Sequence, residues 1–124
     1  MIDHVKLNVS SYPASREFYE KVLAPIGYKL AVDFDNMGGG LVAEGIPDLW
    51  LEEHDPISSP VHVAFSGPDR ESVDEFYRLA MELGARDNGP PGLRPDYHQN
   101  YYAAFVLDPD GNNIEVVCHK PVKE

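Results

Sequence analysis

Apolar and polar residues alternate at the start of the chain and then change to a helical spacing. Val5, Leu7 and Val9 are separated by polar residues, which is the pattern of a half-buried strand. After Ser11, a candidate helix N-cap, apolar residues recur three to four positions apart until Gly27, so the spacing predicts a helix between these two residues. The chain therefore opens with a strand followed by a helix.

The same strand and helix return later in the chain at a constant offset. His4 at the start of the first strand matches His62, and Phe18 in the first helix matches Phe76; both offsets are 58 positions (62 − 4 and 76 − 18). Each of these histidines is followed by Val, and each of these phenylalanines by Tyr. Because strand and helix recur in register, we interpret the chain as a duplicated module.

Short apolar runs separated by turn residues follow each predicted helix. In the first copy the predicted strands are residues 28–34, 40–43 and 49–52, with a glycine break at 38–40. In the second copy they are residues 101–107 and 114–118, joined by an Asp-Pro-Asp-Gly turn at 108–111. Residues 88–100 are rich in Gly, Pro and polar side chains and are predicted to form a loop.

These elements give the order β-α-β-β-β twice, which is an α+β fold. The predicted first module spans residues 1–53, the linker residues 54–60 and the second module residues 61–124. Both modules are expected to belong to one domain, because 124 residues are the length of a single compact unit.

Three residues on the predicted strands are of the types found in divalent metal sites. His4 and His62 begin equivalent strands, so pairing of the modules about a pseudo-twofold axis would direct both imidazoles into one cleft. Glu115 lies inside the apolar run 114–117, where a carboxylate is costly to bury unless it is paired or bound to metal. Two histidines and one carboxylate match a facial triad. The alternative is that the histidines are structural and that Glu115 pairs with a basic residue.

A second group of candidate residues lies before and within the predicted strand 101–107. Tyr101 and Phe105 share one face of this strand and are expected to line a substrate pocket, with Tyr101 as a hydrogen-bond donor. Tyr97 and His98 lie in the preceding loop, where a neutral imidazole can move a proton near neutral pH. The alternatives are core packing for the strand residues and an exposed loop position for His98.

Charge and composition limit the classes of partner. Ten Lys and Arg against 21 Asp and Glu give a net charge of −11, which disfavours nucleic acid and anionic membranes and favours neutral or cationic small molecules. No apolar run approaches the ~20 residues of a membrane-spanning helix. The first residues lack the features of a signal peptide, and the single cysteine fits a reducing compartment. A cytoplasmic location is therefore expected.

The motifs of the chain resemble those of the vicinal oxygen chelate superfamily, which includes glyoxalases, bleomycin-resistance proteins and extradiol dioxygenases. The resemblance covers nearly the whole chain and is carried by residues 2–5, 18–19, 61–64 and 104–115. It implies a glyoxalase-like fold, in which two tandem βαβββ modules form a curved mixed sheet around a cleft, and usually a homodimer. It also implies that His4, His62 and Glu115 bind a divalent metal ion, for which Fe, Mn, Zn and Ni are all candidates.

One position departs from the pattern of the glyoxalases. Those enzymes take a fourth ligand, usually Glu, from the last strand of the first module, and here Trp50 stands in that place. Glu52 on the same strand face is an alternative ligand. Trp50 is expected to line the substrate pocket, and the alternative is that it packs in the core. The departure argues against glyoxalase I activity and leaves a lyase, isomerase or extradiol-type dioxygenase that acts on a small oxygen-chelating substrate. The alternative is a metal-free ligand-binding protein of the bleomycin-resistance type, which the acidic charge favours.

Overall fold

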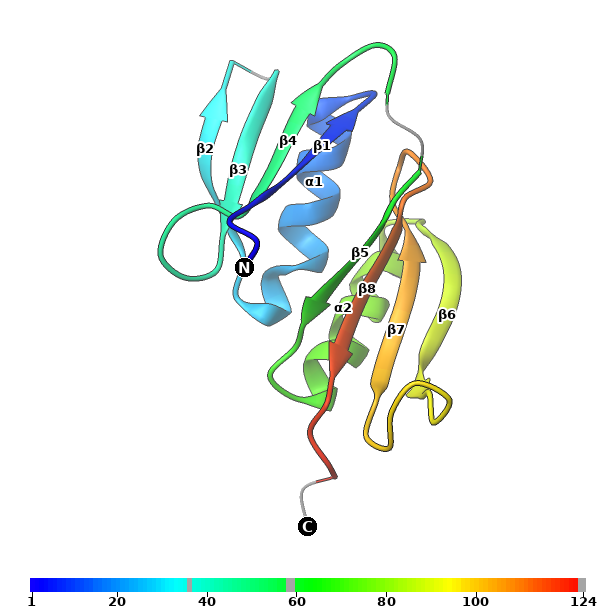
Figure 1. Cartoon of the computed structure of the whole chain (residues 1–124). Coiled ribbons are helices and arrows are strands. Elements are labelled where there is room, and N and C mark those ends of the chain that lie inside the picture. Colours follow the sequence, from blue (N-terminus) through cyan, green and yellow to red (C-terminus); the bar gives the residue numbers. More distant parts are fainter. Residues whose placement is uncertain (36, 58–59, 123–124) are drawn as a thin grey trace.

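Each of the two modules forms a four-stranded mixed sheet with one long helix against it (Figure 1). The computed structural model describes residues 1–35, 37–57 and 60–122. The elements follow the chain in the order β1 (Val5–Val9), α1 (Tyr12–Val22), the short 3-10 helix η1 (Ala24–Ile26), β2 (Lys29–Phe34), β3 (Gly38–Val42), β4 (Leu49–Glu53), β5 (His62–Ser66), α2 (Arg70–Glu82), β6 (Arg86–Leu93), β7 (Tyr102–Leu107) and β8 (Asn113–Cys118). The predicted linker, residues 54–60, includes positions 58–59, which lie outside the described residues. In the described ranges no helix has the length and apolar character needed to cross a membrane.

The strand order is the same in both sheets, β1-β4-β3-β2 and β5-β8-β7-β6. In each module the first strand runs parallel to the last strand, and the remaining neighbours are antiparallel. This topology confirms the predicted α+β fold of two tandem βαβββ modules. The two sheets remain separate within the chain, because β1 and β5 are both edge strands and do not pair with each other in the described residues.

Both long helices begin after a side-chain N-cap, of which Ser11 was predicted and Asp69 was not. The side chain of Ser11 accepts a hydrogen bond from the Ala14 amide, and Asp69 accepts one from the Ser72 amide at 2.8 Å. Gly27 follows η1 with a φ of 97°, a conformation that glycine adopts without strain. The helices pack against the sheets and against each other. Figure 1 shows both helices behind the strands, so the opposite faces of the two sheets are open on the same side of the chain.

Residues 88–93 of the segment predicted as a loop belong to a strand, so the prediction was wrong for this part, whereas residues 94–100 form turns outside any strand. β6 spans Arg86–Leu93 and is the edge strand of the second sheet, where proline is tolerated because one side of the strand makes no ladder hydrogen bonds. Its register against β7 is interrupted around Gly89 and Gly92. A pattern based on alternating apolar residues cannot identify a strand whose inward positions are glycine.

The predicted glycine break at residues 38–40 also lies inside a strand, β3, whose residues are all buried. These glycines leave room for aromatic rings from neighbouring elements. A Cβ on Gly39 would meet the Tyr12 hydroxyl, and one on Gly40 would lie 2.9 Å from the Trp50 indole. The glycines are therefore a packing requirement of the first sheet rather than a turn.

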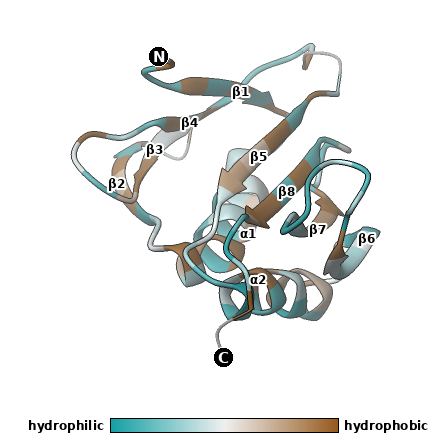
Figure 2. Cartoon of the chain, turned by 60° about the horizontal axis from the view of Figure 1, so that its bottom comes forward, coloured by the Kyte–Doolittle hydropathy of each residue, from teal (hydrophilic) through white to brown (hydrophobic). Residues whose placement is uncertain are grey.

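The hydrophobic core lies between the helices and the sheets. Its largest fully buried side chains include Tyr12, Tyr19 and Phe76, so the aromatic residues of both helices lie at its centre. Figure 2 shows hydrophobic segments on β5 and β8, with many hydrophilic residues in the connecting loops. The helical spacing placed Phe18 and Phe76 on the apolar faces of the two helices, and both are buried, whereas Tyr12 and Tyr19 were not predicted as core residues.

A nearly buried carboxylate connects the two modules. Asp108, which is 3% exposed, accepts a hydrogen bond from the Tyr19 hydroxyl of α1 at 2.5 Å. It also accepts from the amides of Asp110 and Asn112 and from the side-chain nitrogen of Asn112. The side-chain oxygen of Asn112 in turn accepts from the Val61 amide at 2.9 Å, directly before β5. This network joins α1 to the starts of β5 and β8.

Replacing Tyr19 with Phe is expected to lower the free energy of unfolding by about 1–3 kcal/mol, because Asp108 then lacks one of its four donors in a buried setting. Urea unfolding at neutral pH measures the change. The control is Tyr77→Phe, at the equivalent position of the second module, where the side chain is only half-buried. Its expected effect is below about 0.5 kcal/mol, and equal losses in the two variants would contradict a special role for the Asp108 network.

Candidate functional site

The open face of the second sheet carries a buried carboxylate with two side-chain partners. Glu115 lies on β8 between Ala64 of β5 and Phe105 of β7, and it is 1% exposed. Its Oε1 accepts a hydrogen bond from His62 Nε2 at 2.7 Å, and its Oε2 accepts one from the Tyr101 hydroxyl. An unpaired carboxylate at this depth would be strongly unfavourable, so these two donors stabilise it. We call the three residues the Glu115 centre.

The two partners of Glu115 differ in their protonation chemistry. Burial, together with the hydrogen bond to Glu115 and its negative charge, raises the pKa of Tyr101 to about 12, so at neutral pH the hydroxyl keeps its proton and donates. The side chain of His62 is 52% exposed. Because an ionised carboxylate only accepts, the Nε2 atom of His62 carries the hydrogen of this contact. The Glu115 centre thus combines a fixed carboxylate with an imidazole that a ligand can reach.

The predicted pocket residues before β7 gather around Tyr101. The ring centroids of Tyr97 and Tyr101 are 5.1 Å apart in an edge-on arrangement. The ring of His98, an exposed residue, lies 6.0 Å from that of His119, which lies 5.2 Å from Tyr101. His98 is therefore near the Glu115 centre but is separated from Glu115 by other rings.

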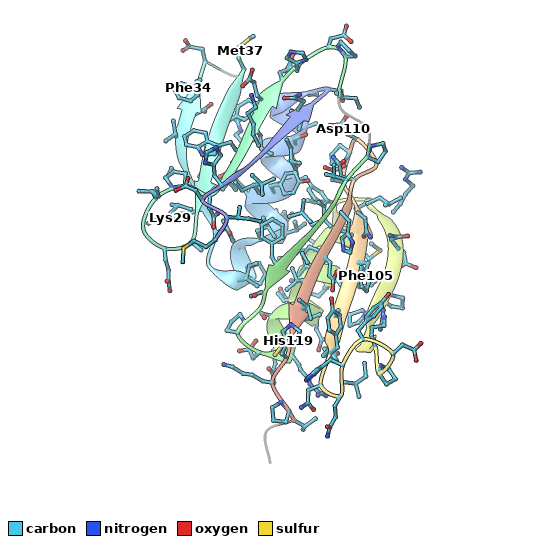
Figure 3. The ribbon with its side chains drawn as sticks, in the orientation of Figure 1. Lys29, Phe34, Met37, Phe105, Asp110 and His119 are labelled. Carbon is cyan, nitrogen blue, oxygen red and sulfur yellow. The ribbon has the colours of Figure 1, made fainter. Side chains whose placement is uncertain are left out.

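His119 belongs to this group of rings, although no role was predicted for it from the sequence. It directly follows β8, where Figure 3 labels it at the end of the strand. Glu115, Val117 and His119 occupy alternate positions and so share one side of an extended chain. That alternation was the signal in the sequence that pointed to His119.

Trp50 occupies in the first sheet the position that Glu115 has in the second. Each of them follows the residue paired with the equivalent valine of the first strand in its module, Val5 in β1 and Val63 in β5. An indole therefore stands where a symmetrical duplication would place a second carboxylate.

A pocket of about 620 Å³ lies beside Trp50 on the open face of the first sheet. The rings of Phe34 and Trp50 stack with their centroids 6.3 Å apart and their planes at 19°. Phe34 and Met37 are 57% and 60% exposed and lie near each other at the end of the β2–β3 hairpin (Figure 3). Neither residue was predicted from the sequence, although large apolar residues at a hairpin end were a signal for an apolar wall. Glu52, the alternative ligand, also lines the pocket and pairs with Lys6 at 3.3 Å.

His4 lines the same pocket as Trp50 and is not part of the Glu115 centre. Its Nδ1 lies 2.7 Å from Asp3 Oδ1. Across the described part of the chain, no group of three or more His, Cys, Asp or Glu side chains is placed to hold a metal ion. The single chain therefore brings together two of the three predicted ligands, His62 and Glu115, and carries the third on the other sheet.

A model of the Glyoxalase/Bleomycin resistance protein/Dioxygenase superfamily matches residues 1–116. The chain, with its paired βαβββ modules, therefore belongs to this superfamily. No curated protein matches the sequence.

Several solved structures share the fold. A glyoxalase/bleomycin resistance protein from Albidiferax ferrireducens is 22% identical, with a TM-score of 0.76 over 95% of this chain and 97% of that one. A possible glyoxalase from Bacillus cereus is 28% identical, with a TM-score of 0.71 over 95% and 98%. A lactoylglutathione lyase from Agrobacterium tumefaciens is 20% identical, with a TM-score of 0.70 over 95% and 92%. These similarities extend along nearly the full length of each chain.

Folding raises the pKa of Tyr101 from 10.0 to about 12, so this residue stabilises the fold fully below about pH 10 and loses that contribution between about pH 10 and 12. We expect Tyr101→Phe to remove one tyrosinate transition with a midpoint near pH 12 from an ultraviolet titration, with circular dichroism following the fold. Tyr97→Phe, which removes the neighbouring hydroxyl, is expected to leave that transition in place. A missing transition near pH 10 in Tyr101→Phe would contradict the hydrogen bond to Glu115.

Proposed function

We propose that the protein is a metal-dependent enzyme that acts on a small molecule with two neighbouring oxygen atoms. The observation that carries this proposal is the 2.7 Å contact between His62 Nε2 and Glu115 Oε1 on an open sheet face. Imidazole and carboxylate are ligands that Fe, Mn, Zn and Ni all accept. With metal–ligand bonds near 2.1 Å, two adjacent ligands at a right angle are about 3 Å apart, so this pair fits two neighbouring positions around one ion. A bound ion would replace the hydrogen between the two atoms, and the neutral imidazole of His62 would then carry its hydrogen on Nδ1.

We assign the third ligand, His4, to a second copy of the chain. His4 lines the open face of the first sheet, whereas His62 and Glu115 lie on the open face of the second. In a twofold dimer that places each first-sheet face on the partner's second-sheet face, one His4 joins each His62–Glu115 pair and two equivalent sites result. The same contact would cover the exposed apolar side chains around Phe34, which are otherwise unfavourable in water.

Other residues of the chain orient the metal ligands and form the walls of the substrate site. When bound, a divalent ion supplies a Lewis acid that holds two substrate oxygens and stabilises negative charge. The Tyr101 hydroxyl holds the Glu115 carboxylate in one orientation, and Phe105 and Trp50 provide apolar walls for a flat substrate. Because Trp50 replaces a second carboxylate, proton transfer of the glyoxalase I kind is not expected at this site.

Metal analysis tests the ligand assignment. After removal of bound metal and incubation with Fe(II), Mn, Zn or Ni, the native protein is expected to retain about one ion per chain of its preferred metal. His62→Ala and His4→Ala are each expected to lose it, because three protein ligands are the minimum of the proposed set. His54→Ala is the control, since the ring of His54 bonds Pro56 outside the site. A native protein that retains none of the four metals would contradict the metal-dependent function.

Mixing the two variants tests the contribution of a second copy. When His4→Ala and His62→Ala chains exchange subunits freely, about half of the dimers are mixed, and each mixed dimer has one site with both histidines intact. About a quarter of all sites are therefore expected to regain metal. No recovery, in a mixture shown to contain mixed dimers, would mean that both histidines act within one chain.

A second candidate function, metal-free binding of a planar cation, is favoured by the stacked and exposed rings of Phe34 and Trp50. Their pocket is mostly apolar and belongs to a protein with a net charge of −11. Flat cationic ligands gain both stacking with the rings and attraction from this charge.

Trp50 is the only tryptophan, so its fluorescence reports directly on this pocket. We expect N-methylquinolinium to quench it in chelator-treated protein, and Phe34→Ala to weaken the binding about three- to tenfold, because one stacking surface is lost. Neutral quinoline serves as the comparison for charge, and Met37→Ala as the comparison for a nearby exposed side chain. Unchanged Trp50 fluorescence at saturating ligand would contradict this second function.

A further inference from the structure

An arginine lies beside the Glu115 centre on the same sheet face. Arg94 directly follows β6, and its Cζ atom lies 5.4 Å from the centroid of the Phe105 ring. The His62 ring lies 6.1 Å from the same centroid. The ring of Phe105, which Figure 3 labels on β7, therefore lies between the Arg94 guanidinium and the His62 imidazole and is near both.

The strand register gives the distance between Gly89, on one side of Phe105, and Glu115, on the other. Gly89, Phe105 and Glu115 are neighbours across β6, β7 and β8. With strands about 4.8 Å apart, Gly89 and Glu115 are separated by about 10 Å. The guanidinium of Arg94 lies next to Gly89. The distance from this guanidinium to the Glu115 carboxylate is therefore about the length of one small aromatic molecule.

The chain holds the Arg94 side chain in place. A Cβ on Gly89 would lie 3.2 Å from its Nη2 atom, and one on Gly92 would lie 3.1 Å from its Nη1 atom, so these two glycines leave room for the guanidinium. Nη2 donates to the Pro90 carbonyl at 2.7 Å, and the Arg94 amide donates to the Tyr101 carbonyl at 2.7 Å. A cation fixed in this way loses little conformational entropy when a ligand binds.

Arg94 has no acidic partner among the described residues, although the protein has 21 acidic and ten basic side chains. Its other side-chain contact is a long one, 3.5 Å from Nη1 to the Leu93 carbonyl. By contrast, Arg78 on α2 pairs with Glu75 and Glu82. A guanidinium has five N–H donors, so Arg94 retains donors that can bind an anion.

We propose that Arg94 anchors a carboxylate of the ligand, and that the ligands of this face are small planar carboxylic acids lying on Phe105 with their other end at His62 and Glu115. A carboxylate matches the planar fork of a guanidinium. A single negative charge also suits a protein of net charge −11 better than the two charges of a phosphate. The inference rests on the proposed function for placing the substrate on this face, and it specifies the class of that substrate.

The experiment compares benzoate with benzamide, which has the same ring but no charge, in chelator-treated and isotope-labelled protein. Binding is followed by the NMR signals of the Arg94 side-chain N–H and of the Gly89 and Gly92 amides. We expect benzoate to bind at least about fivefold more tightly than benzamide, because a charge-assisted bidentate contact is stronger than a neutral one. Arg94→Gln is expected to weaken benzoate binding about five- to tenfold and to leave benzamide binding within about twofold.

Two further variants test whether the effect depends on the position and the shape of the Arg94 side chain. Arg78→Gln removes the same charge from α2 and is expected to leave benzoate binding unchanged, whereas Arg94→Lys keeps the charge without the fork and is expected to fall between native protein and Arg94→Gln. Equal binding of benzoate and benzamide, equal losses in the two glutamine variants, or tighter Arg94-dependent binding of phenyl phosphate would each overturn the proposal. Because metal is absent throughout, a failure of metal binding leaves this result standing, and the reverse is also true.

Discussion

The hydrogen bonding of one buried carboxylate fixes the relation between the two modules. Asp108 accepts four hydrogen bonds, three from its own turn and one from Tyr19 on the helix of the other module. Through Asn112 the same turn reaches the backbone directly before His62. The positions of β5 and β8, and with them the contact between His62 and Glu115, therefore depend on a group that lies away from the open faces. The Asp-Pro-Asp-Gly turn is thus part of the architecture of the site as well as a chain reversal.

A second buried carboxylate, Glu115, has a different character. Asp108 receives donors from backbone amides and from a buried tyrosine, and such partners do not exchange easily. Within the part of the chain that the structure describes, Glu115 receives two side-chain donors, one of them from a half-exposed histidine on an open face. A carboxylate held by replaceable partners can accept a new one when a ligand arrives, whereas a carboxylate enclosed by its own turn cannot. Because of this difference in partners, Asp108 has a structural role, whereas Glu115 is suited to binding a ligand.

The sequence predicted the parts of this arrangement that depend on local pattern. The offset between His4 and His62 revealed the duplicated module, and the apolar run around Glu115 identified a carboxylate that required partners. It did not predict β6, because glycines at its inward positions make room for another side chain, Arg94, and carry no apolar period. Nor does periodicity determine which edge strands meet, so two separate sheets could not be distinguished from one continuous sheet. The packing of the two modules depends on surfaces formed by residues that are distant in sequence, so a local sequence pattern does not predict it.

The pairing of first strands with last strands has a consequence for how the chain folds. Val5 pairs with Leu49 and His62 pairs with Asn113, contacts that are 44 (49 − 5) and 51 (113 − 62) residues apart in sequence. Each sheet therefore closes only after nearly all of its module is available, and such high contact order slows folding because a long loop must be ordered first. During synthesis the first module is complete before β5 is made, but β5 has no neighbouring strand until β8 has been made. The unpaired edge of β5 is thus the segment most exposed to wrong partners in a chain that is still being made.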